Sequence, residues 1–209
     1  MKKGNAFILL GLLLIAAALA LTGFNLWDNL RAGKAARDML EQLEPLVCDD
    51  PVPPTGQSTG DSDSPDEIEY PDYVLNPWMD MPVKKINGES YVGIVSVPAI
   101  SCELPVYSQW TYENMKNGPC RYTGTAYLDD MVICGHNNNM HFGGLRNLSQ
   151  GDEVLFTDMD GNIFRYRVLE IETLEPEAIT EMTTGDWDLT LFTCTYTGAA
   201  RVTVRCAKS

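Results

Sequence analysis

A long apolar run near the amino terminus constrains this chain more than any other feature. It extends from Ala6 to Phe24 behind the basic start Met1-Lys2-Lys3. As an α-helix, these roughly 19 residues span about 28 Å, close to the ~30 Å hydrocarbon core of a bilayer. We therefore expect a membrane-spanning helix, with Trp27 as an aromatic anchor at the interface. A signal peptide cut near Ala18-Leu19-Ala20 and a buried helix are the alternatives.

The charges on either side of the apolar run decide its orientation. Lys2 and Lys3 favour a cytoplasmic amino terminus, whereas the basic residues between positions 31 and 37 oppose it. We expect the amino terminus inside, because everything downstream reads as an exported domain. The segment from Arg31 to Leu46 is typical of a short amphipathic helix that continues from the membrane.

The stretch from Pro45 to Pro82 is rich in proline and acidic residues. It carries eight of the 12 prolines and no Lys or Arg. Its acidic residues are Asp49, Asp50, Asp61, Asp63, Asp66, Glu67, Glu69, Asp72 and Asp80. Prolines favour extended conformations and like charges repel, so this stretch predicts an extended, mostly disordered spacer. The whole chain has a net charge of −14, which argues against a nucleic-acid partner.

The remaining residues read as an all-β domain with short helices. Apolar or alternating segments predict strands at Tyr91–Val97, Leu128–Cys134, Gly151–Thr157, Ile163–Glu172, Leu189–Phe192 and Arg201–Cys206. Asp160-Gly161 predicts a hairpin turn, and helical spacing is confined to short pieces such as Tyr112–Asn117 and Glu177–Met182. Many short strands favour a closed or nearly closed β-barrel. We therefore expect an anchor at 1–27, a juxtamembrane helix and linker at 28–86, and a folded domain at 87–209.

The six cysteines are compatible with three disulfides or with free thiols of unequal reactivity. Cys102, Cys134 and Cys206 lie in apolar, strand-like segments and are most simply core residues. Cys194 instead ends an apolar strand and precedes a polar loop, where a substrate can reach its thiol. This position makes Cys194 the candidate nucleophile.

A nucleophilic cysteine needs a proton-transfer partner and a group that stabilises an oxyanion. The chain has two histidines: His136 follows a predicted strand end, and His141 lies in a polar loop. Arg201 begins the strand after Cys194, and Arg205 shares its face. No CxxC pair supports a zinc site, so we expect neither a metal nor a cofactor.

Four motifs, in the same order along the chain, resemble the sortase family. Residues 190–194 read TLFTC, which is similar to the family's TLxTC signature, and TYTGAARVTVRCA resembles the following loop and last strand. Upstream, ICGHNNNMHFGGLRNLSQGDEV resembles the family's Gly-His strand end, and IVSVPAISCELPVY resembles its opening strands. The resemblance implies Cys194 as nucleophile, His136 as general acid/base and Arg201 as the group that stabilises substrate and oxyanion. It also implies Thr193 as a substrate-binding residue.

This resemblance implies an eight-stranded sortase-type β-barrel, preceded by an N-terminal transmembrane helix and an extended linker. Such membrane-anchored cysteine transpeptidases cleave an LPxTG-like sorting signal after its Thr and hold the product as a thioester. They then transfer it to an amine, such as a peptidoglycan precursor or a pilin Lys, and so attach surface proteins to the cell wall of Gram-positive bacteria. The implied location is the cell membrane, with a single span, a cytoplasmic amino terminus and an extracellular catalytic domain.

The sequence favours a class D-like enzyme, with class B-like next. The short stretch from Thr173 to Asp186 leaves little room for the class B helical insertion, and the chain ends soon after its last strand, unlike class C. Asn76-Pro77-Trp78 differs from the Asp-Pro-aromatic lid of class C and is interpreted as a turn of the spacer. The carboxylates of residues 153, 158 and 160 are interpreted as a solvated hairpin rather than a Ca²⁺ site.

Other functions remain open on the sequence. A pilin-polymerising sortase differs in the acceptor amine, and a cysteine protease would use water as acceptor with the same residues. A catalytically silent module would use the barrel to hold a peptide, but the trio of Cys194, His136 and Arg201 argues against it. A disulfide-stapled structural barrel would lack free thiols.

Overall fold

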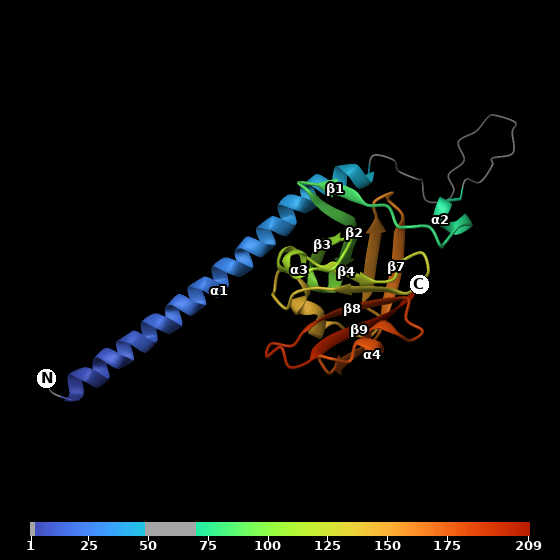
Figure 1. Cartoon of the computed structure of the whole chain (residues 1–209). Helices are drawn as coiled ribbons and strands as arrows, with labels where there is room; N and C mark the ends of the chain where they lie inside the picture. Colours follow the sequence, from blue (N-terminus) through green and yellow to red (C-terminus); the bar gives the residue numbers. More distant parts are fainter. Residues whose placement is uncertain (1–2, 49–69) are drawn as a thin grey trace, which may run out of the picture.

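The computed structural model describes residues 3–48 and 70–209. Its helices are α1 (Lys3–Cys48), α2 (Asp72–Leu75), α3 (Tyr112–Asn117) and α4 (Ile179–Thr183), with the 3₁₀ helices η1 (Pro98–Ile100) and η2 (Phe142–Asn147). Its strands are β1 (Lys84–Ile86), β2 (Glu89–Val97), β3 (Cys102–Tyr107), β4 (Cys120–Thr123), β5 (Met131–Cys134), β6 (Glu153–Asp158), β7 (Ile163–Leu174), β8 (Leu189–Cys194) and β9 (Arg201–Lys208). Figure 1 shows α1 projecting as a long helix from the body formed by the strands.

The strands close into a barrel of mixed topology. Within the described residues, nine strands follow the order β1-β2-β3-β4-β5-β8-β9-β7-β6, and β2 also pairs with β6. That extra pairing closes β2 to β9 into eight strands, while β1 pairs with β2 outside the closed circuit. The pairs β3–β4 and β5–β8 are parallel, and the other neighbouring pairs are antiparallel. The predicted all-β architecture and eight-stranded barrel are confirmed.

The barrel interior is built by alternation along the strands. In β7 the buried positions alternate with exposed ones from Ile163 to Val168, as the period of two requires. Inward side chains from several strands form one apolar cluster, which includes Val154, Phe156, Phe164, Tyr166, Val168, Leu189, Leu191 and Val204. Burial of such side chains contributes roughly 1.5–3 kcal/mol each. This rigid wall fixes the ends of β5, β8 and β9, where the candidate site lies.

The predicted hairpin joins β6 to β7 through a turn centred on Asp158. Its buried carboxylate accepts hydrogen bonds from the backbone N–H groups of Asp160 and Asn162, each 2.9 Å long. The Tyr127 hydroxyl donates to the same carboxylate over 2.8 Å. Gly161 has a φ of 84°, a conformation that glycine adopts without steric cost. The hairpin prediction is confirmed, but the interpretation of its carboxylates as solvated is wrong for Asp158, whose buried carboxylate stabilises the turn itself.

Helix α1 has two halves in different surroundings. Its apolar amino-terminal side chains are exposed, and an apolar window of mean hydropathy 2.6 has none of its surface buried in the protein. Among the described helices, α1 is the one long and apolar enough to cross a membrane. Farther along, Gly33, Ala36, Leu43 and Val47 are buried against the barrel. Their spacing of three, four and seven residues is that of a single helix face, which confirms the amphipathic helix predicted after the membrane segment.

This docking changes the interpretation of the proline-rich spacer. Residues 49–69 of the predicted linker lie outside the described residues, and in chain order they follow the docked half of α1. They therefore do not separate the apolar half of α1 from the barrel, because the helix itself makes that connection. On the other side, Met81 is buried in the core and β1 begins at Lys84. The fold thus begins before residue 87, the predicted start of the folded domain.

The segment around α2 packs at the end of the barrel where β5 and β8 begin. Tyr73 stacks on Tyr127, with ring centroids 4.6 Å apart, and also contacts Phe164. Trp78, in the Asn76-Pro77-Trp78 turn, is 80% exposed. Because Cys194 lies at the opposite end of β8, this turn is in no position to cover it, in agreement with the interpretation of the segment as a turn rather than a lid.

Candidate active site

Three strand ends meet at one rim of the barrel. Strands β5 and β8 are parallel, so their carboxyl ends lie at the same rim, and antiparallel β9 begins there. Strand β8 lies between the other two. Its last residue, Cys194, is half-buried, whereas the preceding residues of the strand are buried. The fold therefore presents the Cys194 thiol at the rim without exposing the strand that carries it.

Arg201 lies directly beside Cys194. The two residues are register partners in the antiparallel pair of β8 and β9. Side chains of such partners leave the same face with Cβ atoms about 4.5–5.5 Å apart. The Arg201 guanidinium donates through Nη1 to the carbonyl oxygens of Gly198 and Ala200, each at 3.2 Å. Both acceptors belong to the loop between β8 and β9, so the guanidinium lies against that loop.

His136 lies on the other side of Cys194. Cys134 is the partner of Phe192, and the Gly135 N–H donates to the Phe192 carbonyl over 3.0 Å. The pairing ends at Cys134, and His136 follows two residues later, at the same rim as the end of β8. The imidazole is exposed. The structure therefore orders His136, Cys194 and Arg201 along the rim on three neighbouring chain segments.

Thr193 connects two of these segments from below the rim. It is buried, and its hydroxyl donates to the Gly135 carbonyl over 2.8 Å. This hydrogen bond joins the end of β8 to the residue before His136. The predicted substrate-binding role of Thr193 stays a prediction, since its hydroxyl hydrogen is used within the protein.

His141, the second histidine, lies in a different environment. It is 2% exposed and belongs to a turn that packs beneath the rim. The Cys102 thiol contacts its backbone carbonyl, with 3.8 Å between sulfur and oxygen. The contrast with the exposed His136 agrees with the assignment made from the Gly-His motif.

The other cysteines of the barrel are buried free thiols. Among the cysteines whose side chains the structure describes, Cys102, Cys120, Cys134, Cys194 and Cys206 are free, and of these Cys194 alone is not buried. Burial raises the pKa of Cys102 and that of Cys206 to about 12, because an apolar interior disfavours the thiolate. The pKa of Cys134 is also raised, first by a hydrogen bond with Cys120 and then by burial. These thiols are protonated at neutral pH. Because they are free, none of them supports the alternative of a disulfide-stapled structural barrel.

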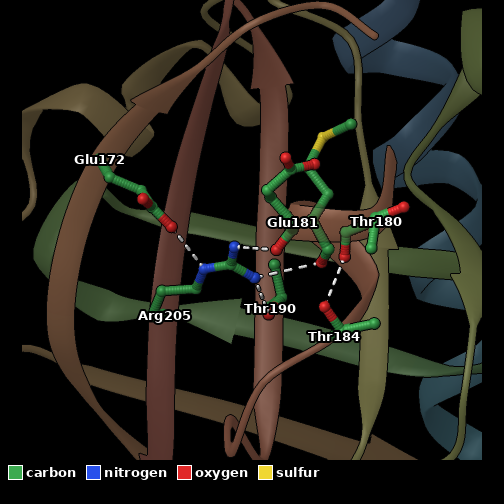
Figure 2. Close-up of polar contacts among 7 residues, drawn as sticks. Glu172, Thr180, Glu181, Thr184, Thr190 and Arg205 are labelled. Atoms are coloured by element: carbon green, nitrogen blue, oxygen red, sulfur yellow. Dashed lines mark hydrogen bonds and ion pairs between the residues drawn. The ribbon is translucent and has the colours of Figure 1, made fainter. Parts of the chain in front are cut away.

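Sequence reasoning missed the network around Arg205. This side chain is 2% exposed and pairs with Glu172 over 2.8 Å (Figure 2). It also donates to Thr190 Oγ1 over 3.0 Å and to the carbonyls of Glu181 and Met182 in α4. Arg205 therefore connects β7, β8, β9 and α4. An arginine inside an alternating apolar strand was the available signal, but its partners are 15 to 33 residues away.

A second contact that the sequence did not indicate links the two loops beside the site. Arg146 in η2 donates to the hydroxyl of Tyr196, and its guanidinium carbon lies 3.9 Å from the centre of that ring. Tyr196 belongs to the loop after Cys194, and η2 follows His136. The cation–π contact therefore ties the loops that flank the rim to each other.

The arrangement combines the groups that acyl transfer requires. A reachable thiol, an exposed imidazole and a guanidinium occupy one rim, as a nucleophile, a proton carrier and an oxyanion donor must. Within residues 3–48 and 70–209, no group of three His, Cys, Asp or Glu side chains is placed to hold a metal ion.

Comparison with known proteins agrees with this geometry. Residues 95–209 match the sortase domain, which is more than half of the chain. This chain belongs to the sortase family and is a cysteine transpeptidase. It is 22% identical to sortase A of Bacillus anthracis over 204 residues, which covers 93% of this chain and 89% of that protein.

Solved structures of several sortase classes share the fold. Sortase C1 of Streptococcus agalactiae superposes with a TM-score of 0.53 at 23% identity, over 60% of this chain and 70% of that one. A sortase D5 transpeptidase of Clostridium perfringens gives 0.51 at 23% identity, over 60% and 82% of the two chains. Sortase A of Corynebacterium diphtheriae gives 0.52 at 22% identity, over 64% and 74%. These similarities at comparable levels support the fold and do not distinguish the classes.

Proposed function

We propose that this sortase cleaves an LPxTG-like sorting signal after its Thr and transfers the acyl group to an amine, with Cys194 as nucleophile. The observation that carries the proposal is the row of His136, Cys194 and Arg201 along one rim of the barrel. The first step forms the bond between the Cys194 sulfur and the Thr carbonyl carbon. The C–N bond then breaks, and His136 gives its proton to the departing amine. The product of this half-reaction is a thioester.

The second half-reaction reverses these roles. An incoming amine attacks the thioester carbonyl, and its nitrogen gives a proton to His136. The bond to sulfur breaks, and the electron pair returns to Cys194 as thiolate. Because the same histidine donates and then accepts one proton, the enzyme leaves the cycle in its starting protonation state.

Arg201 acts on the oxygen that carries negative charge in both steps. Its guanidinium can give two hydrogen bonds at fixed geometry to a carbonyl or an oxyanion. Two hydrogen bonds of 3.2 Å to the carbonyls of Gly198 and Ala200 hold the guanidinium beside Cys194.

Class D-like remains our choice of subclass, with class B-like next. The connection between β7 and β8 contains the short α4, which supports the absence of a long class B insertion. The favoured task is attachment of surface proteins to the cell wall through a peptidoglycan amine, and the alternative is pilin polymerisation through a Lys. We also propose a cytoplasmic amino terminus, so that the barrel lies outside the cell.

The test uses the full chain in detergent micelles with a panel of LPxTG-like peptides. Each peptide is incubated with and without an amine such as triglycine or a Lys-containing peptide, and products are identified by mass spectrometry. We expect cleavage after Thr and an amine-dependent shift from acid product to amide product. Cleavage to the acid alone, unchanged by every amine, would favour a cysteine protease, and no covalent Cys194 adduct with any peptide would refute the proposal.

A further inference from the structure

The docked half of α1 contacts the turn that follows His136. Gly33 of α1 is buried, and a side chain added there would place its Cβ 3.0 Å from Met140 Cγ and 3.3 Å from Met140 Cβ, closer still to the methyl group. Glycine is thus the residue that permits this approach. By contrast, a Cβ at Gly11 or Gly23 in the amino-terminal half would meet nothing within 4 Å.

Met140 lies on a turn that is held together by the side chain and carbonyl of Asn138. The Met140 N–H donates to Asn138 Oδ1 over 3.0 Å. The N–H groups of His141 and Gly143 donate to the Asn138 carbonyl over 3.1 Å and 2.8 Å. Three hydrogen bonds therefore converge on Asn138 and tie the residues of the turn to one another.

The same turn is joined to His136. The Phe142 N–H donates to the His136 carbonyl over 3.1 Å, and Phe142 is fully buried. Gly135 packs on that ring so closely that a Cβ there would lie 2.6 Å from Phe142 Cδ2. A displacement of the turn therefore passes to the backbone of His136 through one hydrogen bond and one packed ring.

Space beside this contact allows such a displacement. A cavity of about 400 Å³ lies between α1, the segment that starts β3 and the turn, and its lining includes Ala36, Leu104 and Met140. Because the turn is not fully enclosed there, the contact with Gly33 is one of the restraints on its position.

We propose that α1 is a positioning element of the active site, acting on His136 through the contact between Gly33 and Met140. The inference rests on the proposed role of His136 in proton transfer. It makes the membrane-proximal helix part of the catalytic unit: about six residues, or ~9 Å of helix, separate Trp27 from Gly33. Activity then depends on how the helix is seated, and misplacement of a catalytic group by about 1 Å can cost up to ~100-fold in rate.

The experiment compares Gly33→Leu with Gly23→Leu in the full chain in detergent micelles. Leu at position 33 must displace Met140, whereas Leu at position 23 enters open space on the same helix. We expect kcat of Gly33→Leu to fall about 10- to 100-fold with KM for the sorting peptide nearly unchanged, and Gly23→Leu to match the parent. Gly33→Ala should lose less, and the double variant Gly33→Ala/Met140→Ala should recover part of that loss. A KM effect without a kcat effect, or no recovery in the double variant, would overturn the inference.

A second measurement separates this inference from the proposed function. Hydrogen–deuterium exchange of residues 136–147 should be faster in Gly33→Leu than in the parent and in Gly23→Leu, with the strands of the barrel unchanged. If the parent protein shows no transpeptidation, the proposed function fails, while the exchange data still decide whether α1 holds the turn. Equal exchange in all three proteins would overturn the positioning role. If exchange in Gly33→Leu is faster throughout the barrel, the same measurement is made on Met140→Ala, which removes the contact without adding bulk.

Discussion

The rim of this barrel and its buried positions contain the same three reactive residue types in opposite surroundings. At the rim, Cys194 and Arg201 are half-buried and His136 is exposed. Away from the rim, Cys206, His141 and Arg205 are each at most 2% exposed. The residue type alone therefore does not determine whether a side chain can react with a substrate, and its position along the strand does. A strand end gives a side chain access to substrate, while the middle of the same strand encloses it in the packed wall.

The two arginines show the difference most clearly. Both lie on β9, four residues or about 13 Å apart along the strand. Arg201 holds two loop carbonyls at 3.2 Å and is able to exchange them for a substrate. Arg205 is fixed by a carboxylate, a hydroxyl and two carbonyls from three other elements. One guanidinium is available for binding and the other is part of the framework.

The largest expected contrast is between the cysteines. Cys194→Ala should abolish peptide cleavage with little change in thermal stability, because the thiol lies at a strand end. Cys206→Ala should instead cost ~1–3 kcal/mol of stability through a cavity, with turnover retained in the folded fraction. Steady-state cleavage rates give the turnover of both variants, and chemical denaturation gives their free energies of unfolding. Normal turnover in Cys194→Ala would remove the assignment of the nucleophile.

The histidines should differ nearly as much. His136→Ala should remove almost all transpeptidation, because neither half-reaction then has a proton carrier. His141→Ala should lower stability, since it empties a buried site, while turnover per folded molecule falls mildly. Transpeptidation rates, corrected for the folded fraction by circular dichroism, make the comparison. The reverse pattern would show that the wrong histidine has been placed at the rim.

Arg201→Lys should reduce turnover about 10²–10³-fold, if it loses a donor to the oxyanion. Lysine keeps the charge but lacks the planar fork that gives two hydrogen bonds at fixed geometry. Arg205→Lys should act on stability rather than turnover, since one ammonium cannot replace a guanidinium that contacts four acceptors. Cleavage rates and urea midpoints of both variants separate the effects. If Arg201→Lys were as active as the parent, the site would consist of a Cys–His pair alone.

Much of the rim was predictable from the sequence because its signals are local. The TLFTC strand, the Gly-His strand end and the first residue of the final strand each occupy a short segment. Strand endings follow from where apolar alternation stops, so the positions of Cys194, His136 and Arg201 on the barrel could be inferred. The helix Tyr112–Asn117 has the predicted bounds, and its Thr111 side chain caps it by accepting from the Asn114 N–H over 3.0 Å.

The long-range contacts were not predictable in this way. Glu172 lies 33 residues from Arg205, and Tyr196 lies 50 residues from Arg146, so no local pattern relates them. The docking of α1 was missed for a different reason. An apolar stripe on a helix after a membrane segment predicts burial but does not name the surface that covers it. Composition then suggested a tether after the membrane, whereas Ala36, Leu43 and Val47 attach the helix directly to the barrel.

The smallest expected contrast concerns the interior thiols at alkaline pH. Burial raises the pKa of Cys206 from an ordinary value of 9.0 to about 12 in the folded protein. The folded state therefore keeps this proton more strongly than the unfolded state does. The resulting stability is fully present below pH 9 and is lost as the pH rises from about 9 toward about 12.

Replacing this thiol with a group that does not ionise should remove that loss. Cys206→Val is close in volume, so it should cost under ~1.5 kcal/mol at pH 7. Between pH 9 and pH 11, however, its free energy of unfolding should fall less steeply than that of the parent, by on the order of 1 kcal/mol at pH 10. Tyrosine ionisation acts equally on both proteins and cancels in the difference. Urea denaturation at pH 7, 9, 10 and 11 measures the free energy of unfolding of both proteins. If the two plots against pH were parallel, the Cys206 thiol would ionise as easily as a thiol in water. The distinction between rim and interior would then not extend to protonation.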